Sequence, residues 1–336
     1  GVVIGAAWNG ARAFTATSGP GISLMSEFLG LAYFAEIPAV IWDIQRSGPS
    51  TGMPTRTQQG DLIGAAYASH GDTKHPLLFP STPKECFDFA AQALDLADRL
   101  QTPIMVLSDL ELGMNDNLSE PFEWDDSRRY DRGKVLSAKD LDEVEVFGRY
   151  LDVDGDGIGY RTYPGTHPEK GAFFTRGTSR DEFAVYTESG EVYQRNMERL
   201  QKKWQTARTM VPAAQIADKG QAVGVLYYGT TALPMPEALD NLAESGIHMD
   251  TCRVRAFPFG EEVEQFIASH DLVFVAEQNR DGQMRSLLIN ELQTNPAKLI
   301  SVLYYAGLSI SADTITEQIS DYYIENKLSR VTEVQT

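Results

Sequence analysis

Side chains that bind metals or form disulfides are scarce in this sequence. Its 336 residues include two cysteines, Cys86 and Cys252, and five histidines. The two cysteines lie far apart and lack the spacing of metal ligands, so the sequence predicts neither a disulfide framework nor enough thiolates for an iron–sulfur cluster. We therefore expect no metal centre in this chain and a reducing, cytoplasmic location.

Long apolar runs and basic charge are also missing. No stretch of 18 or more apolar residues occurs, so the sequence predicts no membrane-spanning helix, and no secretory signal is evident. The 29 Lys and Arg residues stand against 47 Asp and Glu residues, a formal net charge of −18. This balance argues against general nucleic-acid binding, which needs a basic surface. The acidic residues are spread along the chain, so solubility is their simplest role.

The first residues are unusual for the start of a polypeptide. Gly1 stands where an initiator methionine would be, and residues 2–12 are mostly apolar or small. We interpret residues 2–12 as a buried helix. We also expect the chain to be the carboxyl-terminal portion of a longer polypeptide.

Short apolar runs alternate with helical patterns over residues 1–115. The expected strands are residues 13–17, 38–44, 77–79 and 103–108, and the expected helices are residues 22–35, 58–69 and 83–100. This alternation, with continuous apolar residues in the strands, predicts a parallel α/β sheet.

The rest of the chain divides into an irregular stretch and a second α/β unit. Residues 116–205 are polar and turn-rich, so we expect an extended linker with one charged helix near residues 186–206. Residues 206–325 return to the strand–helix alternation and predict a second α/β domain, followed by a tail at 326–336. Its expected strands are residues 222–228, 249–256, 272–276 and 299–303, and its expected helices are residues 233–245, 261–269 and 282–292.

Two runs rich in Gly, Pro, Ser and Thr follow strands of the first unit, at residues 15–21 and 45–55. In α/β sheets, the loops at the carboxyl ends of the strands are where ligands bind. Thr17, Ser18 and Gly19 lie in the first run, where small residues let the backbone approach a ligand and free amides open the next helix. A tight strand-to-helix turn without a ligand explains the same residues equally well.

Arg46 opens the second run directly after an apolar strand, so its backbone should be well fixed. A guanidinium binds a carboxylate through two parallel hydrogen bonds, and the pattern therefore indicates a clamp for an anionic small molecule. A surface arginine paired with a nearby acid is the alternative.

An acidic loop at residues 152–157 matches part of a calcium-binding loop. Its three aspartates and Gly157 fit positions 1, 3, 5 and 6 of an EF-hand. Position 12 is Tyr163 rather than the required glutamate, so we favour a plain turn. A rival functional hypothesis, a non-catalytic calcium-dependent interaction module, leaves the two loops described above unexplained.

Other polar residues lie beside expected strands. The run Glu277-Gln278-Asn279 follows an apolar strand and opens a helix, so it could face the other domain, face a ligand or only cap the helix. His248 and His270 are expected to be structural. His70 and His75 lie near the proposed site in sequence, and a role for either in a pocket stays open.

Several of these runs together resemble the α subunit of 2-oxoacid:ferredoxin oxidoreductases, most of all the 2-oxoglutarate type (2-oxoglutarate synthase). The matching runs are residues 15–21, 45–55, 59–62, 161–166, 277–283 and 305–307. They cover nearly the whole chain in order. The resemblance implies a parallel-sheet, thiamine-diphosphate pyrimidine-binding-like domain at residues 1–115 that lacks its start. It also implies a transketolase carboxyl-terminal-like α/β domain at residues 206–325.

The resemblance implies a thiamine diphosphate enzyme that is active only with a separate β subunit. The implied reaction is the CoA-acylating oxidative decarboxylation of 2-oxoglutarate to succinyl-CoA and CO₂, with reduction of ferredoxin, and it can run in reverse to fix CO₂. Pyruvate or branched-chain 2-oxoacids are alternative substrates within the class. Mg²⁺ and a [4Fe–4S] cluster are expected on the β subunit of an α2β2 assembly. Since ferredoxins are generally acidic, we expect ferredoxin to dock on the β subunit rather than on this acidic chain.

The resemblance also assigns roles to particular residues. Arg46 matches the family's arginine that holds the substrate carboxylate, and Thr17, Ser18 and Gly19 match a loop near the cofactor. A second carboxylate would need another cation or donor, for which the candidates by proximity in sequence are Arg12, Arg56, Lys74 and His70.

The sequence also departs from the family. The glutamate that protonates the aminopyrimidine and a substrate-contacting threonine precede the stretch that matches residues 1–6, in a part that often carries a fused γ-type domain. Residues 177–182 differ from the Glu-His-Asp-Glu run of many relatives, so no role is carried over to them.

Overall fold

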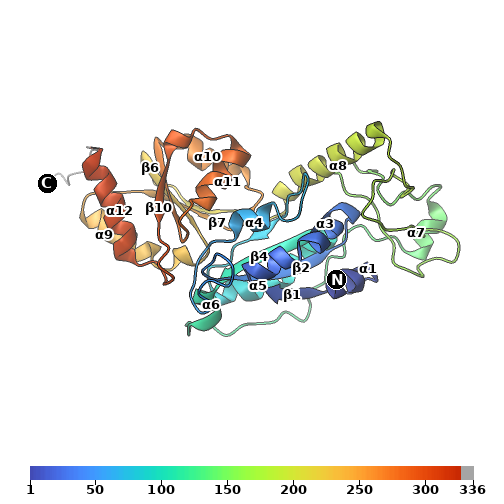
Figure 1. Cartoon of the computed structure of the whole chain (residues 1–336), viewed down its shortest axis with the longest axis horizontal. Coiled ribbons are helices and arrows are strands. Elements are labelled where there is room, and N and C mark those ends of the chain that lie inside the picture. The colour runs from blue at the N-terminus through green and yellow to red at the C-terminus, as the bar shows by residue number, and fades with distance from the viewer. Residues whose placement is uncertain (327–336) are drawn as a thin grey trace.

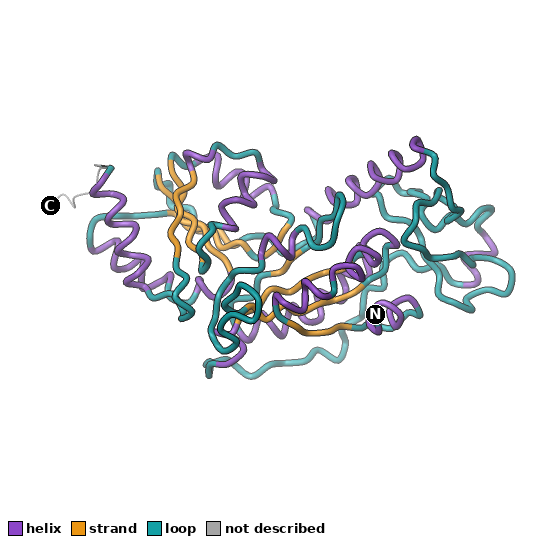
Figure 2. The backbone as a smooth tube through the Cα atoms, viewed as in Figure 1, coloured by secondary structure: helices purple, strands orange, loops and turns teal. Residues whose placement is uncertain are grey.

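Two β-sheets with flanking helices make up most of the computed structural model, which describes residues 1–326 (Figures 1 and 2). The strands of the first sheet, in spatial order, are β1 (Phe14–Thr17), β2 (Ala39–Gln45), β4 (Pro103–Asp109), β3 (Leu77–Leu78) and β8 (Ala256–Phe257). The first four run parallel, and β8 pairs antiparallel with β3. The carboxyl ends of β1, β2 and β4 therefore meet at one edge.

The second sheet has the same number of strands and again one antiparallel edge. Its spatial order is β10 (Leu299–Leu303), β9 (Leu272–Glu277), β6 (Val223–Tyr228), β7 (Asp250–Val254) and β5 (Gln215–Ala217). Only β5 runs antiparallel to its neighbour. The first sheet lies between this second sheet and the irregular part of the chain (Figure 1).

Helices cover the faces of both sheets. In the first half they are α1 (Val2–Trp8), α2 (Gly19–Leu24), α3 (Ser26–Ala35), α4 (Leu62–Ala66), α5 (Pro83–Leu100) and α6 (Leu110–Met114), whereas α7 (Ala138–Glu143) lies in the irregular part of the chain, away from the sheets. In the second half they are α8 (Gly190–Arg208), α9 (Met235–Glu244), α10 (Glu261–Ser269), α11 (Gln283–Leu292) and α12 (Ala312–Glu325), with short 3₁₀ turns η1 (Gly229–Ala232) and η2 (Pro296–Lys298). Thr82 caps α5, because its hydroxyl accepts a hydrogen bond from the Glu85 amide and Pro83 opens the helix.

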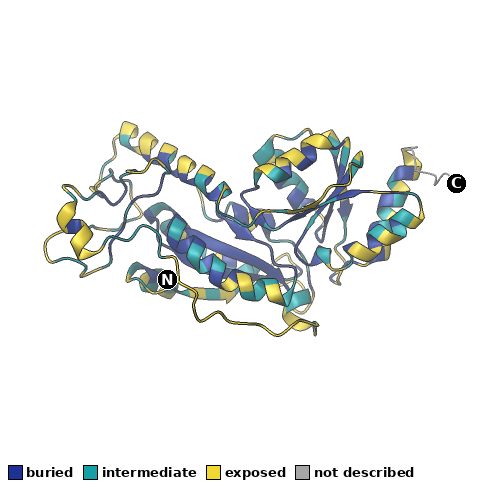
Figure 3. Ribbon diagram, turned by 180° about the vertical axis from the view of Figure 1, so that it is seen from behind, coloured by how far each residue is buried: buried dark blue, intermediate teal, exposed yellow. Residues whose placement is uncertain are grey.

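One apolar core continues from the first sheet into the second. It contains Met105 of β4, Leu226 of β6 and Val275 of β9, together with the ring of Phe79, which meets Tyr228 edge-on at 5.1 Å. Figure 3 shows the buried strands between the more exposed helices. This shared core fixes the carboxyl ends of the two sheets against each other.

The expectation of parallel α/β sheets is confirmed, but three local predictions are wrong and one helix was missed. The first helix is short and mostly half-buried, with only Ala7 fully buried. The helix expected at 58–69 is reduced to α4, because Gln59 and Gly60 bond to the second unit instead. The strand expected at 249–256 divides after β7, and β8 joins the first sheet. The final helix α12 was not expected.

Residues 116–205 follow an extended course outside the sheets. Their regular structure is limited to α7 and to α8, which continues to Arg208. The charged helix expected near 186–206 corresponds to α8. The domain boundaries at 115 and 205 stay a prediction. Within residues 1–326 no helix is long and apolar enough to cross a membrane. The expected tail at 326–336 lies, beyond its first residue, outside the described residues.

Candidate functional site

The two loops singled out in the sequence lie side by side at the carboxyl edge of the first sheet. Thr17 ends β1 and pairs in register with Asp43 of β2, and Arg46 directly follows β2. Ser18 is extended and precedes α2, which begins at Gly19. The fold therefore brings Thr17, Ser18, Gly19 and Arg46 to adjacent strand ends.

Close packing accounts for the glycines of the first loop. A β-carbon at Gly19 would overlap the carboxylate of Asp61, and a β-carbon at Gly21 would overlap the hydroxyl of Thr17. Neither glycine has a positive φ, so the requirement is for space rather than for an unusual backbone. The loop is held tightly against the start of α4.

Arg46 is partly buried and has a free guanidinium. Among residues 1–326 its side chain makes neither a hydrogen bond nor an ion pair, and its Nε is buried without a partner. The backbone around it is fixed, because Ser47 N donates to Arg56 O at 2.8 Å and Met53 N donates to Ser47 O at 2.9 Å. A fixed, unpaired guanidinium suits a carboxylate ligand, and within the described residues no acid lies at ion-pair distance from Arg46.

Two buried carboxyl groups lie behind this loop. Both oxygens of Asp43 and one oxygen of Asp61 are buried without hydrogen-bond partners. Burial raises the pKa of Asp61 to about 6, opposed by the Gly19 amide and the charge of Arg46. Burial and the neighbouring Asp61 raise the pKa of Asp43 well above its usual range. A carboxyl that stays protonated can donate a hydrogen bond to a ligand as well as accept one.

Gln59 joins the strand ends of the two sheets. Its Nε2 donates to Tyr228 O at 3.0 Å, and its Oε1 accepts from Gln278 N at 3.0 Å and from Thr231 Oγ1 at 3.2 Å. Asn279 Nδ2 donates to Gln59 O at 3.0 Å. The polar run that begins at Glu277 thus contacts the first unit, and it also caps α11, because Glu277 Oε2 accepts a hydrogen bond from Met284 N at 2.8 Å.

A further acid belongs to this junction. Asp109 ends β4 and accepts a hydrogen bond from the hydroxyl of Thr230 and another from Glu111 N at 2.9 Å. Burial raises the pKa of Asp109 to about 6 despite these donors. The edge where both sheets meet therefore carries Asp43, Asp61 and Asp109 as weakened acids.

The sequence carries a signal for these acids that the loop motifs alone do not reveal. Asp43 interrupts the otherwise apolar strand 39–44, and a charged residue inside a buried parallel strand calls for a specific function or partner. Gln59 and Asp61 belong to a run that carries the family resemblance, although the resemblance assigned no role to either residue.

The four candidates for a second cation do not share one environment. Arg12 pairs with Asp95 at 2.6 Å, and Lys74 pairs with Glu291 at 2.8 Å, so both are engaged elsewhere. His70 lies on the loop after α4, is exposed to solvent and has its Nδ1 3.4 Å from Ser69 Oγ. Arg56 closes the same loop as Arg46, and its side chain forms no hydrogen bond or ion pair within the described residues. Arg56 is therefore the candidate that the structure retains.

Two of the other histidines, His75 and His270, have structural contacts, whereas His248, also expected to be structural, is exposed. The imidazole of His75 is fully buried, its Nε2 lies 3.0 Å from Ala68 O, and burial lowers its pKa to about 4. His270 lies 3.2 Å from Asp250 and is also buried. Of the pair near the site in sequence, His75 is thus a core residue.

The acidic loop at 152–157 is neutralised from within the chain. Lys134 Nζ lies 2.7 Å from Asp154 and 2.8 Å from Asp156. Asp156 N donates to Asp152 Oδ1 at 3.0 Å, which closes a local turn. The ammonium group occupies the position that a cation would take, which supports the turn interpretation.

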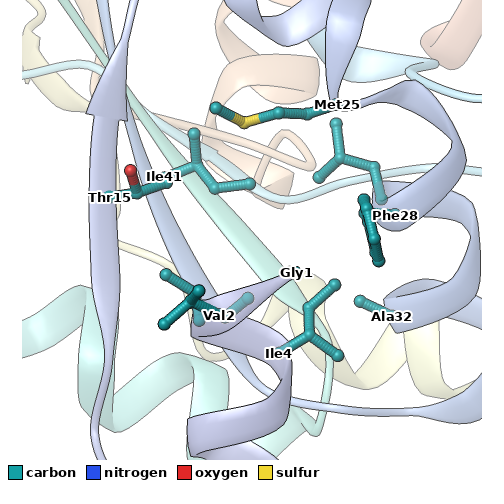
Figure 4. A pocket seen from close by; sticks show the side chains of 11 residues that line it. Gly1, Val2, Ile4, Thr15, Met25, Phe28, Ala32 and Ile41 are labelled. Carbon is teal, nitrogen blue, oxygen red and sulfur yellow. The ribbon is translucent and has the colours of Figure 1, made fainter.

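An apolar pocket lies between α1 and α3, beside the start of the 15–21 run. Its volume is about 230 Å³, and Figure 4 shows side chains such as Val2, Met25 and Phe28 lining it. Thr15 is its only polar side chain. The pocket offers no partner for an anionic substrate, so it is not part of the candidate site.

Comparisons with known proteins agree with this architecture. The family model for the thiamine-diphosphate-binding region of pyruvate flavodoxin/ferredoxin oxidoreductases matches residues 1–143. The 2-oxoglutarate synthase subunit KorA of Methanocaldococcus jannaschii is 31% identical over 291 residues, which cover 82% of this chain and 72% of that protein. The chain belongs to the 2-oxoacid:ferredoxin oxidoreductase α-subunit family. The resemblance seen in the sequence is thereby confirmed.

Other family members are longer. Subunit alpha of 2-oxoacid:ferredoxin oxidoreductase 2 of Aeropyrum pernix is 35% identical over 293 residues, which cover 85% of this chain and 44% of that protein. The chain thus spans less than half the length of this relative.

Solved structures show the same fold. The 2-oxoglutarate:ferredoxin oxidoreductase from Magnetococcus marinus, with 2-oxoglutarate, coenzyme A and succinyl-CoA bound, matches with a TM-score of 0.84 at 27% identity, covering 95% of this chain and 55% of that chain. A split-gene transketolase matches with a TM-score of 0.52 at 11% identity over 95% of this chain and 78% of that chain. The second likeness concerns the fold alone, and it agrees with the transketolase-like architecture expected from the sequence.

Proposed function

We propose that this chain forms part of the α subunit of a thiamine-diphosphate-dependent 2-oxoglutarate:ferredoxin oxidoreductase. The proposed reaction converts 2-oxoglutarate and CoA to succinyl-CoA and CO₂ and passes the electrons to ferredoxin, and it is reversible. The observation that carries the proposal is the match to the M. marinus enzyme along 95% of this chain. That enzyme was solved with 2-oxoglutarate, coenzyme A and succinyl-CoA.

Arg46 is proposed to bind the substrate carboxylate next to the reacting carbon. Its free guanidinium lies at the strand edge beside Thr17, Ser18 and Gly19, and it can offer two parallel hydrogen bonds to a carboxylate. Arg56 closes the same loop and is proposed to bind the second carboxylate, which distinguishes 2-oxoglutarate from pyruvate.

The cofactor is proposed to lie against the loop formed by Thr17, Ser18 and Gly19. Thiamine diphosphate supplies a carbanion that adds to a 2-oxo carbon and stabilises the charge left after decarboxylation. The unpartnered carboxyl oxygens of Asp43 and Asp61 beside this loop fit a polar, nitrogen-bearing ring, because they can accept or donate hydrogen bonds. Mg²⁺ and a [4Fe–4S] cluster are proposed to belong to the β subunit.

The assembly is proposed to be an α2β2 heterotetramer in the cytoplasm, with ferredoxin docking on the β subunit. One observation supports the docking side and another supports the location. The chain carries a net charge of −18, which disfavours contact with an acidic partner. Its cysteines, Cys86 and Cys252, are both free, as is usual in a reducing compartment.

Two substitutions test the substrate assignment in the full-length α subunit purified with its β partner. Arg46→Ala should lower kcat/KM for 2-oxoglutarate and for pyruvate alike, by about 100-fold if a charged hydrogen bond of about 3 kcal/mol is lost. Arg56→Ala should lower kcat/KM for 2-oxoglutarate while leaving that for pyruvate within about twofold. Arg195→Ala, whose side chain is 59% exposed, is the control.

If Arg56→Ala lowers kcat/KM equally for 2-oxoglutarate and for pyruvate, Arg56 does not bind the second carboxylate. A native enzyme that prefers pyruvate over 2-oxoglutarate would replace the proposed substrate with the alternative within the class. An unaffected Arg46→Ala enzyme would keep the class of reaction and exclude Arg46 as the clamp.

A further inference from the structure

The loop between α6 and α7 exposes several large apolar side chains. Residues 118–131 are all exposed, and Figure 3 shows this stretch in yellow along the lower edge of the molecule. We call residues 114–127 the strap. Its large apolar side chains are Met114, Leu118, Phe122 and Trp124. Leu118 is fully exposed and the other three are 47–57% exposed, a pattern that marks a contact surface for another molecule.

Aromatic contacts and an ion pair hold the strap along α5. The ring of Phe122 stacks on Phe87 of α5 with their centroids 5.1 Å apart, and Trp124 meets the same ring edge-on at 6.1 Å. Directly after the strap, Arg128 pairs with Asp95 of α5 at 2.7 Å. These contacts fix the path of the strap, so its exposed groups form a surface of defined shape.

The charge of the strap indicates what kind of partner it fits. Between residues 114 and 127 the sequence has no Lys or Arg but has the acids Asp116, Glu120, Glu123, Asp125 and Asp126. Within the described residues, none of these carboxylates lies within ion-pair distance of a cation. A partner that covers the strap therefore has to bring basic groups, because like charges placed opposite each other disfavour binding.

This requirement argues against a second copy of the chain as the partner. Each further copy brings a net charge of −18, and two straps facing each other would oppose their acids. Nucleic acid is disfavoured for the same reason, because its phosphates need a basic surface. A different protein with a basic surface fits the strap better.

A segment upstream of Gly1 is another possible occupant, because relatives of this chain are longer. Gly1 lies against α3, whereas the strap follows α5. These helices cover opposite faces of the first sheet, since Leu29 of α3 packs in the same core cluster as Ile41, and Phe89 of α5 in that of Val40. An upstream segment would therefore start away from the strap.

The strap begins beside the candidate site. The helix α6 starts directly after Asp109 and ends at Met114, the first residue of the strap. Gly113 of α6 lies against Ile44 of β2, because a β-carbon at Gly113 would be 3.3 Å from an Ile44 methyl group. Arg46 follows two positions later. The β subunit, proposed to carry the cluster, must approach this edge to exchange electrons with the site, which brings it to the strap.

We propose that the strap docks on a basic, partly apolar surface of the β subunit. Leu118 and Trp124 fill apolar recesses of that surface, and the acids of the strap pair with lysines or arginines around them. The strap thereby holds the β subunit against the candidate site. This inference rests on the proposed function, which places a β subunit in the complex.

Photocross-linking in the complete α–β complex tests the docking. The full-length α subunit is produced with p-benzoylphenylalanine in place of Leu118, whose full exposure makes the exchange harmless to folding. After irradiation, mass spectrometry should find cross-links from position 118 to basic segments of the β subunit. Cross-links to a second α subunit, to the upstream part of the α subunit, or to no protein at all would overturn the proposal.

Association of the two subunits gives a quantitative readout, measured by sedimentation of the purified complex on dilution. Leu118→Ser should raise the α–β dissociation constant at least about tenfold, because it removes a buried leucine side chain from the interface. Combining Glu120→Gln, Glu123→Gln and Asp126→Asn should weaken association and reduce its dependence on salt.

Three exposed acids of α9 provide the matched control. The combination of Glu237→Gln, Asp240→Asn and Glu244→Gln should leave the dissociation constant within about twofold of the native value. An unchanged dissociation constant for both strap variants would overturn the proposal. A complex that reduces viologen with 2-oxoglutarate but gives no cross-link from position 118 to the β subunit refutes the docking alone. A cross-linked complex without activity refutes the proposed reaction alone.

Discussion

Replacing Glu36 by glutamine should destabilise this chain far more than most single substitutions. The side chain of Glu36 is fully buried, and its carboxylate binds Arg199 and Lys203 of α8. Burial opposes ionisation of Glu36, but the two cations outweigh it and hold the pKa of the carboxyl well below its usual range. The substitution would leave without a carboxylate the buried cations around it, which are Arg149, Arg180, Arg199 and Lys203.

The expected cost follows from this burial. Breaking a buried ion pair by removing one partner costs about 3–5 kcal/mol, whereas an exposed pair is worth about 0–1 kcal/mol. Glu264 of α10 provides the matched control. Its carboxylate pairs with Arg208, which lies in α8 like Arg199 and Lys203, at 2.7 Å, but the side chain of Glu264 is 55% exposed. Glu264→Gln should therefore change stability by less than about 1 kcal/mol.

The assay is denaturant-induced unfolding of the full-length α subunit with its β partner. A second variant, Glu36→Gln combined with Lys203→Met, should recover part of the loss, because it removes one of the uncompensated charges. Burial already lowers the pKa of Lys203 to about 8, so this ammonium is the most readily replaced of the cations. The reasoning is refuted if Glu36→Gln is no less stable than Glu264→Gln.

Two further predictions concern the candidate site. Gly21→Ala should reduce activity at least about tenfold, because the new methyl group would overlap the Thr17 hydroxyl. Gly64→Ala is the control, because the space around Gly64 is open and activity should not change. Steady-state kinetics of the two variants measure the difference. Burial raises the pKa of Asp61 from 3.8 to about 6 in the folded chain, so native stability should fall by about 2 kcal/mol relative to Asp61→Asn as pH rises from 4 to 6. Burial lowers the pKa of His75 to about 4, so His75 makes native stability rise with pH over this range, but it does so equally in both proteins. If the unfolding free energies of the two proteins change with pH in parallel, the prediction is contradicted.

Elements with strong local signals could be predicted from the sequence. The bounds of α10 and β10 agree with those expected, and β4 and β9 were recognised from their continuous apolar residues. The loop that carries Arg46 was found because Gly, Pro, Ser and Thr follow an apolar strand. In each case the information lies within about ten neighbouring residues.

Features that depend on distant pairing could not be predicted in this way. The antiparallel pairing of β8 with β3 joins residues that are far apart in the chain, and Gln59 meets Tyr228 across 169 positions. The cations around Glu36 looked like ordinary charged residues of an exposed helix and a polar linker. Only the fold shows that Arg199 and Lys203 lie on the buried face of α8.

The central claim is tested most directly by electron transfer from the native complex. The full-length α subunit, purified with its β partner, is mixed with thiamine diphosphate, CoA and methyl viologen, and each 2-oxoacid is added in turn. The account predicts viologen reduction that requires CoA, that is fastest with 2-oxoglutarate and that yields succinyl-CoA. The account would be contradicted by a complex that contains its cofactors but fails to reduce viologen whichever 2-oxoacid is added.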